Sequence, residues 1–317
     1  MSKYSLTIAD TKDLEIIFKH RVEVSYWRGK MNSEQYLERT RRLFRHPFGR
    51  QRISTFILRD ERDEVCASLD ILNVTFLLND QGELREQKVP LITSLVTPAA
   101  KRGRGYASLI LHEYEIRNPS SIFFLYSDIG AQFYERLGYA PFPMAELQEQ
   151  VREAESFLFD AQPIKLDQLI DAAKNACRAW VAETIGAAIC LPDAQFLDWH
   201  LERYRAFAAF TGQTFPPELF WSLRHRDTAD NSVLHHVVAG APDFIAAQFD
   251  CLWLTPGCAQ CVQFAHSLAR ASGVQTIRYW AATPDSATVD DECVPMLKMS
   301  SSCHGTRLLA PQISTWF

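Results

Sequence analysis

A basic, glycine-rich segment in the first half of the chain constrains the fold more than any other feature. It joins an apolar strand expected over Val89–Thr97 to a helix expected to begin near Arg104 and to end at about Ile116. The first N–H groups of a helix lack partners, and the helix dipole adds partial positive charge there. Gly103 and Gly105 carry no Cβ atom that would keep a pyrophosphate away from those groups. The segment therefore predicts a phosphate-binding turn within an α/β fold.

Cationic side chains surround this turn, and two other interpretations of it remain. Lys101, Arg102 and Arg104 would add positive charge around the phosphates, and small Ala107 would let the helix approach the sheet. A dinucleotide fold would need a third glycine after a first strand, and none follows at that spacing. The other alternative is a basic helix start in which the glycines serve only a turn.

A second segment, Ser127–Tyr139, predicts a short helix over about Ile129–Leu137 that follows a buried strand, Ile122–Tyr126. Together the two segments resemble motifs A and B of the GNAT acetyltransferase superfamily. Arg102 to Ala107 matches motif A, Arg/Gln-x-x-Gly-x-Gly/Ala. Motif B is usually Asn-x-x-Ala-x-x-x-Tyr-x-x-x-Gly-Phe; its counterparts here are Ser127, Gly130, Tyr134, Gly138 and Tyr139. The spacing between the motifs suits one helix plus one strand.

Residues from about 90 to 145 are also similar to a narrower group, the fungal lysine N6-acetyltransferase family, which acetylates free lysine on its side-chain amine. The similarity is carried by Thr97-Pro98, by Arg102 to Ser108, and by Leu125 to Gly130 with Phe133-Tyr134 and Pro141-Phe142-Pro143. Weaker similarity lies in Trp27 to Tyr36, Trp199-His200, Tyr279-Trp280 and Thr283-Pro284.

The superfamily resemblance implies a mixed, splayed sheet flanked by helices, the GNAT acyl-CoA N-acyltransferase fold, with acetyl-CoA as co-substrate. The strands Val89–Thr97 and Ile122–Tyr126 would separate and admit the pantetheine arm as an added strand. The coenzyme would contact Leu95, Val96, Thr97, Arg102, Gly103, Arg104, Gly105, Tyr106, Ala107, Ser127 and Gly130.

The same resemblance assigns catalytic roles. Tyr134 would donate a proton to the leaving thiolate, since a phenol of pKa about 10 can protonate a thiolate of pKa about 8.5. The alternative is that Tyr134 only packs or hydrogen-bonds the coenzyme. Asp70, on the strand expected over Val65–Leu78, would accept the proton of the attacking amine. Asp128 lies beside the splay, and the alternative for it is a cap on the following helix.

We expect the acceptor to be a primary amine of a small molecule, in the first instance an amino acid such as lysine acetylated at N6. Tyr26, Trp27 and Arg28 are candidate substrate-binding residues, because an arginine can clamp a carboxylate. Two alternatives stay open: acetylation of a protein lysine or N-terminus, and a non-catalytic sensor that binds acyl-CoA.

The chain of 317 residues predicts two domains. Residues 1–145 would form the acetyl-CoA-binding catalytic domain, and residues 159–317 a C-terminal α/β domain that shapes the acceptor pocket. Pro141, Pro143 and the polar run Glu146–Glu155 indicate the exit from the first domain. The strand, strand, helix, strand order of the second half suggests a degenerate GNAT-like repeat, which is left open.

The remaining expected elements are helices over Asp10–Glu23, Ser33–Phe44, Lys165–Thr184, Asp193–Thr211 and Ala259–Ala271, and strands over Ser5–Ile8, Arg52–Leu58, Ser232–Val238, Phe244–Leu254 and Thr276–Ala281.

Charge and composition narrow the partners. The net charge of -5 gives no long-range attraction to nucleic acid or acidic membranes. No apolar run approaches a signal peptide or a membrane span, so we expect a cytoplasmic protein whose eight cysteines are reduced. The oligomeric state stays open.

Three polar clusters are interpreted as structural, and no metal is expected. Cys258-Ala259-Gln260-Cys261 has metal or redox spacing, but no matching His or Cys pair stands at zinc distance, so it is taken as a helix start. His235 and His236 would point to opposite sides of a strand. The arginines between Arg39 and Arg45 are interpreted as a solvated helix face.

Overall fold

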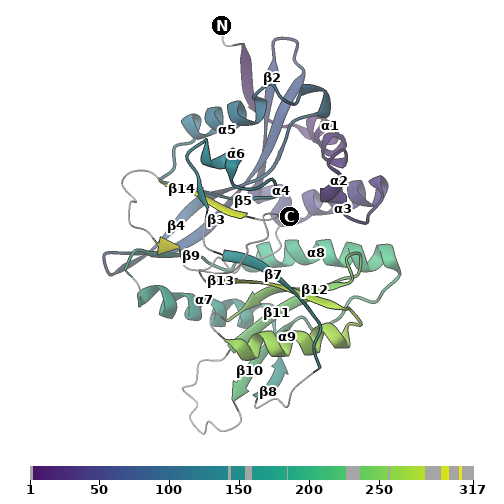
Figure 1. The fold of residues 1–317 in the computed structure, drawn as a ribbon, viewed down its shortest axis with the longest axis vertical. Coiled ribbons are helices and arrows are strands. Elements are labelled where there is room, and N and C mark those ends of the chain that lie inside the picture. Colours follow the sequence, from purple (N-terminus) through teal and green to yellow (C-terminus); the bar gives the residue numbers. More distant parts are fainter. Residues whose placement is uncertain are drawn as a thin grey trace.

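The computed structural model describes residues 3–141, 144–153, 159–183, 185–225, 236–255, 258–282, 294–299 and 307–308. Two mixed sheets with flanking helices make up this part of the chain, one above the other in Figure 1. The predicted α/β class is confirmed.

The first sheet has the order β1 (Tyr4–Ile8), β2 (Ile53–Asp60), β3 (Val65–Asp80), β4 (Glu83–Val96), β5 (Ile122–Ser127), β14 (Val294–Met299) and β6 (Ala140–Pro141). A short branch leaves β3, where β9 (Ala187–Cys190) pairs with β3 and β15 (Arg307–Leu308) pairs with β9. The helices of this half are α1 (Thr11–Val22), α2 (Ser25–Arg28), α3 (Ser33–Arg45), α4 (Pro47–Arg52), α5 (Tyr106–Arg117) and α6 (Gln132–Glu135), with a 3-10 turn at Ala99–Lys101.

The second sheet has the order β7 (Met144–Gln150), β13 (Thr276–Ala282), β12 (Gln248–Leu254), β11 (His236–Asp243), β10 (Phe220–His225) and β8 (Phe159–Pro163). Its helices are α7 (Leu166–Ala182), α8 (Ala194–Thr211) and α9 (Ala259–Ala271). Helix α8 lies in the middle of the molecule in Figure 1 and packs against both α3 and β11. It therefore links the two halves.

Local capping explains where several helices begin. Asp10 caps α1 and forms a reciprocal pair of bonds with Asp13, as the predicted start requires. Asp193 caps α8 through the amide of Phe196. The helix expected to begin at Ser33 is α3; Asn32 is its cap and forms a capping box with Gln35.

Strand pairing crosses the expected boundary between residues 145 and 159. The polar run expected as a domain exit contributes β7, which pairs with β13 along seven positions from Met144 to Gln150. In addition, β9 and β14 come from the second half of the sequence but pair with β3 and β5. The first sheet is therefore completed by residues outside 1–145.

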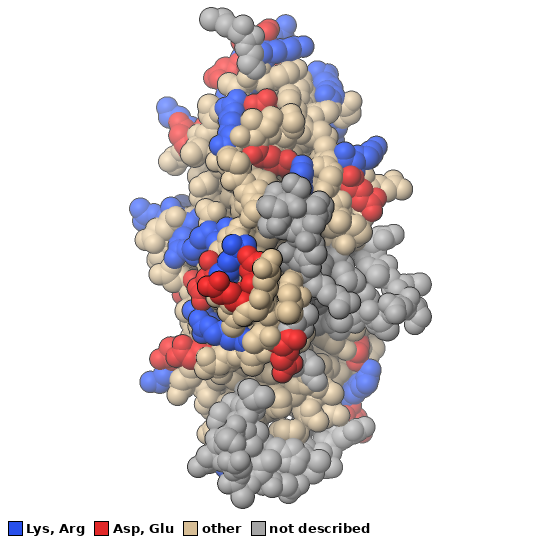
Figure 2. Space-filling view, turned by 90° about the vertical axis from the view of Figure 1, so that its left-hand side faces the viewer, with Lys and Arg blue, Asp and Glu red and all other residues tan. Residues whose placement is uncertain are grey.

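The surface and the interior differ sharply in polarity. On the face in Figure 2, basic and acidic side chains are interspersed. No helix among the described residues is both long enough and apolar enough to cross a membrane. The core of the first sheet is aliphatic and aromatic on both faces, with Phe76 and Phe124 fully buried at its centre.

Candidate active site

A gap opens in the first sheet where β4 and β5 separate. The two strands run parallel but pair only at Leu91–Phe124 and Ile92–Leu125. Beyond that point β4 contains a bulge, because Asp70 of β3 faces Thr93 whereas Ser68 faces Val96. Ser94 lies within the bulge with a φ of 51°. The bulge turns β4 away from β5 and leaves backbone groups of Ser94 and Leu95 at the edge of the gap.

The turn before α5 presents uncovered backbone amides. Gly105 is the N-cap of α5 with a φ of 79°, and no side chain caps the helix. Gly103 has a φ of 76°, and both glycines have open space where a Cβ atom would be. Arg102 and Arg104 are exposed beside them. The turn therefore has the geometry that was predicted for binding a diphosphate.

Lys101 was predicted to add charge around the phosphates, but it is directed elsewhere. Its Nζ atom lies 2.9 Å from Asp60 Oδ2 and 2.5 Å from Glu64 Oε2. Those bonds raise the pKa of Lys101, and the Lys101 bond lowers the pKa of Asp60 to about 2. Lys101 thus fastens the phosphate turn to β2.

Motif B forms a tight turn after β5. The Ser127 hydroxyl donates to the Gly130 carbonyl at 2.6 Å and accepts from the Ile129 amide at 3.3 Å. Gly130 has a φ of 78° and open space beside it. Ser127 is fully buried, so its hydroxyl holds the turn together. The predicted coenzyme contacts of Ser127 and Gly130 stay predictions.

A cavity of about 120 Å³ lies directly at this gap. It is enclosed by α1, α2 and α3 on one side, by strands β2 to β5 and the motif-B turn on another, and by α8 from the second half. Its polar and aromatic lining comprises Arg21, Trp27, Tyr36, Arg39, Thr40, Asp70, Thr93, Ser94, Tyr126, Asp128, Tyr134, Trp199, His200 and Arg203.

Asp70, the predicted base, is buried in this wall. Its Oδ1 atom accepts from Arg21 Nη2 at 2.7 Å and from the Thr55 hydroxyl at 2.6 Å. Only 3% of the residue is exposed. Both of these bonds are made to Oδ1. Arg21 balances the buried charge, and its position was not predicted.

Asp128 and Trp27 lie together in the same cavity. The Trp27 indole donates to Asp128 Oδ2 at 2.6 Å. The alternative that Asp128 caps the next helix is wrong, because Ala131 is the N-cap of α6 and no side chain bonds there. The two residues therefore bring α2 to the mouth of the splay.

The other two candidate substrate residues do not join them. The Arg28 guanidinium lies 3.5 Å from the Ser33 hydroxyl and does not line the cavity. Substrate binding by Arg28 stays a prediction. Tyr26 lies within α2, and its side chain is outside the described residues.

Tyr134, the predicted acid, lies on α6 and lines the cavity from the side of β5. It is 6% exposed and makes edge contacts with Phe133 and Tyr139 at ring-centre distances of 4.9 and 5.8 Å. Neighbouring rings thus fix its orientation. The structure brings Tyr134, Asp70 and Leu95 to one cavity.

Sequence reasoning missed the far wall of the cavity. Arg39 of α3 stacks 4.5 Å from the ring centre of Tyr36, and its buried Nε atom has no hydrogen-bond partner among the described residues. Burial, reinforced by the charge of Arg203, lowers the pKa of Arg39 to about 10. The interpretation of Arg39–Arg45 as a solvated face is wrong for Arg39, but it holds for Arg41, which pairs with Glu15.

Residues of α8 complete that wall. Trp199 donates to the Leu43 carbonyl at 2.8 Å, and His200 and Arg203 reach the cavity from the next turns of the helix. The faint similarity around Trp199-His200 was the only sequence feature that pointed here. An acceptor site built from both halves cannot be read from local spacing.

Comparison with known proteins agrees with this geometry. No protein-family model matches the chain, and no curated protein sequence is similar to it. Solved structures do match. A probable N-acyltransferase from Enterococcus faecalis V583 is 12% identical, with a TM-score of 0.59, over 94% of this chain and 73% of that one. A GCN5-related N-acetyltransferase from Kribbella flavida is 15% identical, with a TM-score of 0.53, over 93% and 72%.

A third match contains a bound acyl-CoA. The N-myristoyltransferase of Saccharomyces cerevisiae with myristoyl-CoA is 9% identical, with a TM-score of 0.53, over 94% of this chain and 83% of that one. The chain therefore has the GNAT acyl-CoA N-acyltransferase fold. At these identities the likeness establishes the fold; the acceptor and the narrower fungal resemblance are matters for the proposal below.

Proposed function

We propose that this protein is an acetyltransferase that transfers the acetyl group of acetyl-CoA to a primary amine of a small molecule. The observation that carries the proposal is the combination of an uncovered helix N-terminus at Gly105 with a sheet gap that opens into a polar cavity. The first feature suits a diphosphate, and the second suits a thioester and its acceptor. The known structures with this fold support the same reaction class.

The reaction would proceed by direct attack within a ternary complex. The amine nitrogen bonds to the thioester carbon while backbone N–H groups near Leu95 stabilise the charge on the carbonyl oxygen. An alkylamine has a pKa of about 10.4, so it must lose a proton, which the Asp70 carboxylate accepts directly or through water. The carbon–sulfur bond then breaks, and the Tyr134 hydroxyl donates its proton to the leaving thiolate.

The acceptor we favour is an amino acid with a side-chain amine, such as lysine acetylated at N6. The cavity holds carboxylates, Asp70 and Asp128, beside the splay, and two arginines, Arg39 and Arg203, on α3 and α8. Acids suit the amine and arginines suit an α-carboxylate. Arg39 forms no ion pair with a carboxylate among the described residues, so its charge is left for a ligand.

A matched pair of acceptors tests the proposal. Lysine and cadaverine differ only by the α-carboxylate, so mass spectrometry of the products with acetyl-CoA should show kcat/KM at least ten-fold higher for lysine. Ornithine, spermidine, a lysine-containing peptide and a peptide with a free N-terminus complete the panel. Preference for a peptide would favour a protein acetyltransferase. Tight acetyl-CoA binding without transfer to any acceptor would favour a sensor.

Two arginines of the same helix provide the matched variants. Arg39→Gln should raise KM for lysine about ten-fold and leave KM for cadaverine unchanged, because only lysine offers it a carboxylate. Arg41→Gln is the control, since Arg41 pairs with Glu15 on the surface. Equal effects of Arg39→Gln on both amines would refute recognition of a carboxylate without refuting acetyl transfer.

A further inference from the structure

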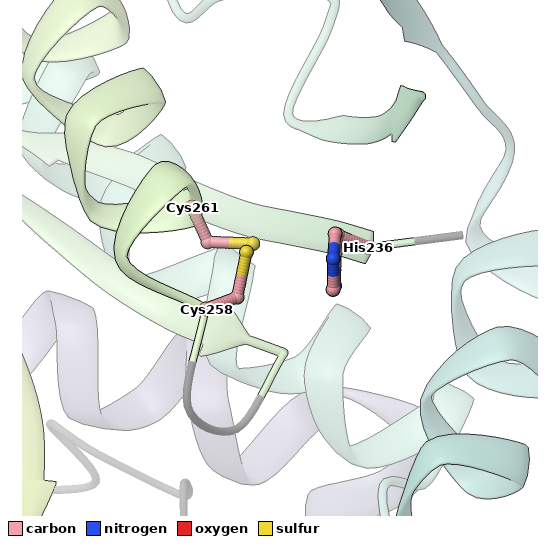
Figure 3. Close-up of side chains that lie close together, drawn as sticks. All are labelled: His236, Cys258 and Cys261. Carbon is pink, nitrogen blue, oxygen red and sulfur yellow. The ribbon is translucent and has the colours of Figure 1, made fainter. Parts of the chain in front are cut away.

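A second cluster of reactive side chains lies in the other half of the molecule, away from the acceptor cavity. His236 begins β11, Cys258 is the N-cap of α9, and Cys261 lies in the first turn of that helix. One ligand atom from each residue lies within 4.8 Å of the other two. In Figure 3 the two sulfur atoms face each other and the His236 ring stands opposite them.

The two cysteines are buried, and His236 is half-buried. Cys258 is 7% exposed and Cys261 is fully buried. The His236 Nδ1 atom is buried and has no hydrogen-bond partner among the described residues. The Cys261 sulfur donates to the Val237 carbonyl over 3.9 Å, and the Cys258 sulfur donates to Gln260 Oε1 over 3.5 Å. A buried ring nitrogen without a partner is unfavourable, and a bound ion would satisfy it together with the two thiols.

We propose that His236, Cys258 and Cys261 bind a zinc ion. Zinc–sulfur bonds of about 2.3 Å and zinc–nitrogen bonds of about 2.0 Å place tetrahedral ligands about 3.5–3.8 Å apart, which small side-chain rotations reach here. Two thiolates and one imidazole are ligands that zinc prefers, and they disfavour magnesium or calcium. Among the described residues the protein supplies three ligands.

The ion would fasten α9 to β11. One ligand comes from β11 of the second sheet and two come from the start of α9, which covers that sheet. None of the three lines the acceptor cavity. Sequence spacing missed this arrangement because the histidine lies 22 residues before the cysteine pair, outside the usual zinc motifs. The site is therefore a structural feature of the second half, separate from acetyl transfer.

Metal analysis of the full-length chain tests the proposal. Elemental analysis of protein purified under reducing conditions, without chelators, should find about one zinc ion per chain. X-ray absorption at the zinc edge should find two sulfur ligands and at least one nitrogen ligand. After exchange into cobalt(II), a sulfur-to-cobalt charge-transfer band should appear. These measurements use the unaltered chain, so they do not depend on a variant that folds.

Variants identify the ligands. Cys258→Ala, Cys261→Ala and His236→Asn should each lose the bound metal, whereas Cys251→Ala should keep it, since Cys251 is a buried thiol of the same core outside the cluster. A chelator should lower the melting temperature of the wild type and of Cys251→Ala. The proposal is overturned by reduced wild type that takes up neither zinc nor cobalt, or by a stable Cys258–Cys261 disulfide in protein without metal. Metal that persists in all three cluster variants would overturn it as well.

Discussion

Two units of the chain, β3–β4–α5–β5 and β11–β12–α9–β13, have the same order of strands and helix. They differ in the residue at which the helix begins. In β3–β4–α5–β5 the first strands are antiparallel and β5 is parallel to β4. In β11–β12–α9–β13 the directions are the same. The first helix begins at bare Gly105, and the second begins at Cys258 within a cluster of thiols. The two units therefore combine the same order of elements with different residues at the helix start.

The two units also differ in the space beside their parallel strand pairs, β4–β5 and β12–β13. In the first unit β4 and β5 part and a cavity lies at the opening. In the second unit the last paired residues, Asp250 and Arg278, bind each other through two bonds of 2.9 Å. Tyr204 and Gln248 also bond to Asp250, which is fully buried. The second unit thus holds a closed polar network at the position where the first unit has a cavity.

The largest expected effect comes from the buried carboxylates of the two units. Asp70→Asn and Asp250→Asn each remove one partner of a buried ion pair, so each should lower the free energy of unfolding by about 3–5 kcal/mol in urea titrations. Only Asp70→Asn should also lower kcat, by about 10²-fold, because only Asp70 lines the cavity. Equal loss of kcat in both variants would remove the functional distinction between the units.

The next largest effect distinguishes Tyr134 of the first half from Tyr279 of the second unit. Tyr134→Phe should lower kcat by about 10²-fold while the Kd for acetyl-CoA stays the same, since only proton donation to the thiolate is lost. Tyr279 of the second unit donates to Glu149 at 2.5 Å, and Tyr279→Phe should cost about 1 kcal/mol of stability with kcat unchanged. Steady-state kinetics and calorimetry measure both. A Tyr134→Phe enzyme with full kcat would leave Tyr134 a packing role.

Much of the coenzyme half could be predicted because its determinants are local. The glycines, the apolar strand before them and Tyr134 stand at fixed offsets within one stretch of sequence, and the resemblance that these residues carry implied the splay. Helix starts such as Asp10 and Asp193 were readable for the same reason. The cap at Asn32 was not predicted, because the helix was expected to begin at Ser33, and the residue three positions later, Tyr36, cannot close a capping box. The box is instead formed by Asn32 and Gln35.

The acceptor wall and the pairing between the halves could not be predicted, because both depend on contacts between distant segments. Arg39 resembles its neighbours Arg41 and Arg42 in sequence and differs only in facing α8 and Tyr36. Arg21 meets Asp70 across 49 positions. Strand β14 completes the first sheet from near the end of the chain. The spacing of apolar residues predicts which face of a helix is buried, but it does not predict which segment packs against that face.

A smaller effect distinguishes the two helix junctions. Gly105 and Gly273 both have positive φ and open space beside them. Gly105→Ala and Gly273→Ala should therefore share a strain cost of about 1–2 kcal/mol. Only Gly105→Ala should weaken acetyl-CoA binding, about ten-fold in titration calorimetry, because its methyl group enters the space proposed for the diphosphate. An unchanged Kd for Gly105→Ala, or an equal change for Gly273→Ala, would place the coenzyme elsewhere.

The smallest effect is a difference in acid response between the halves. Lys101 holds the pKa of Asp60 at about 2, below its unfolded value, so that pair contributes stability above about pH 4 that is lost as the pH falls towards 2. Burial, with the neighbouring charge of Asp250, raises the pKa of Asp243, so its contribution is greatest at low pH and falls as the pH rises.

Relative to the wild type in urea unfolding, Asp60→Asn should be less stable at neutral pH and should converge with it in acid. Asp243→Asn keeps the acceptor oxygen for the amides of Ile245 and Ala246, and it should gain on the wild type as the pH rises from 3 to 7. Parallel pH curves for the two variants would mean that these carboxylates do not distinguish the halves.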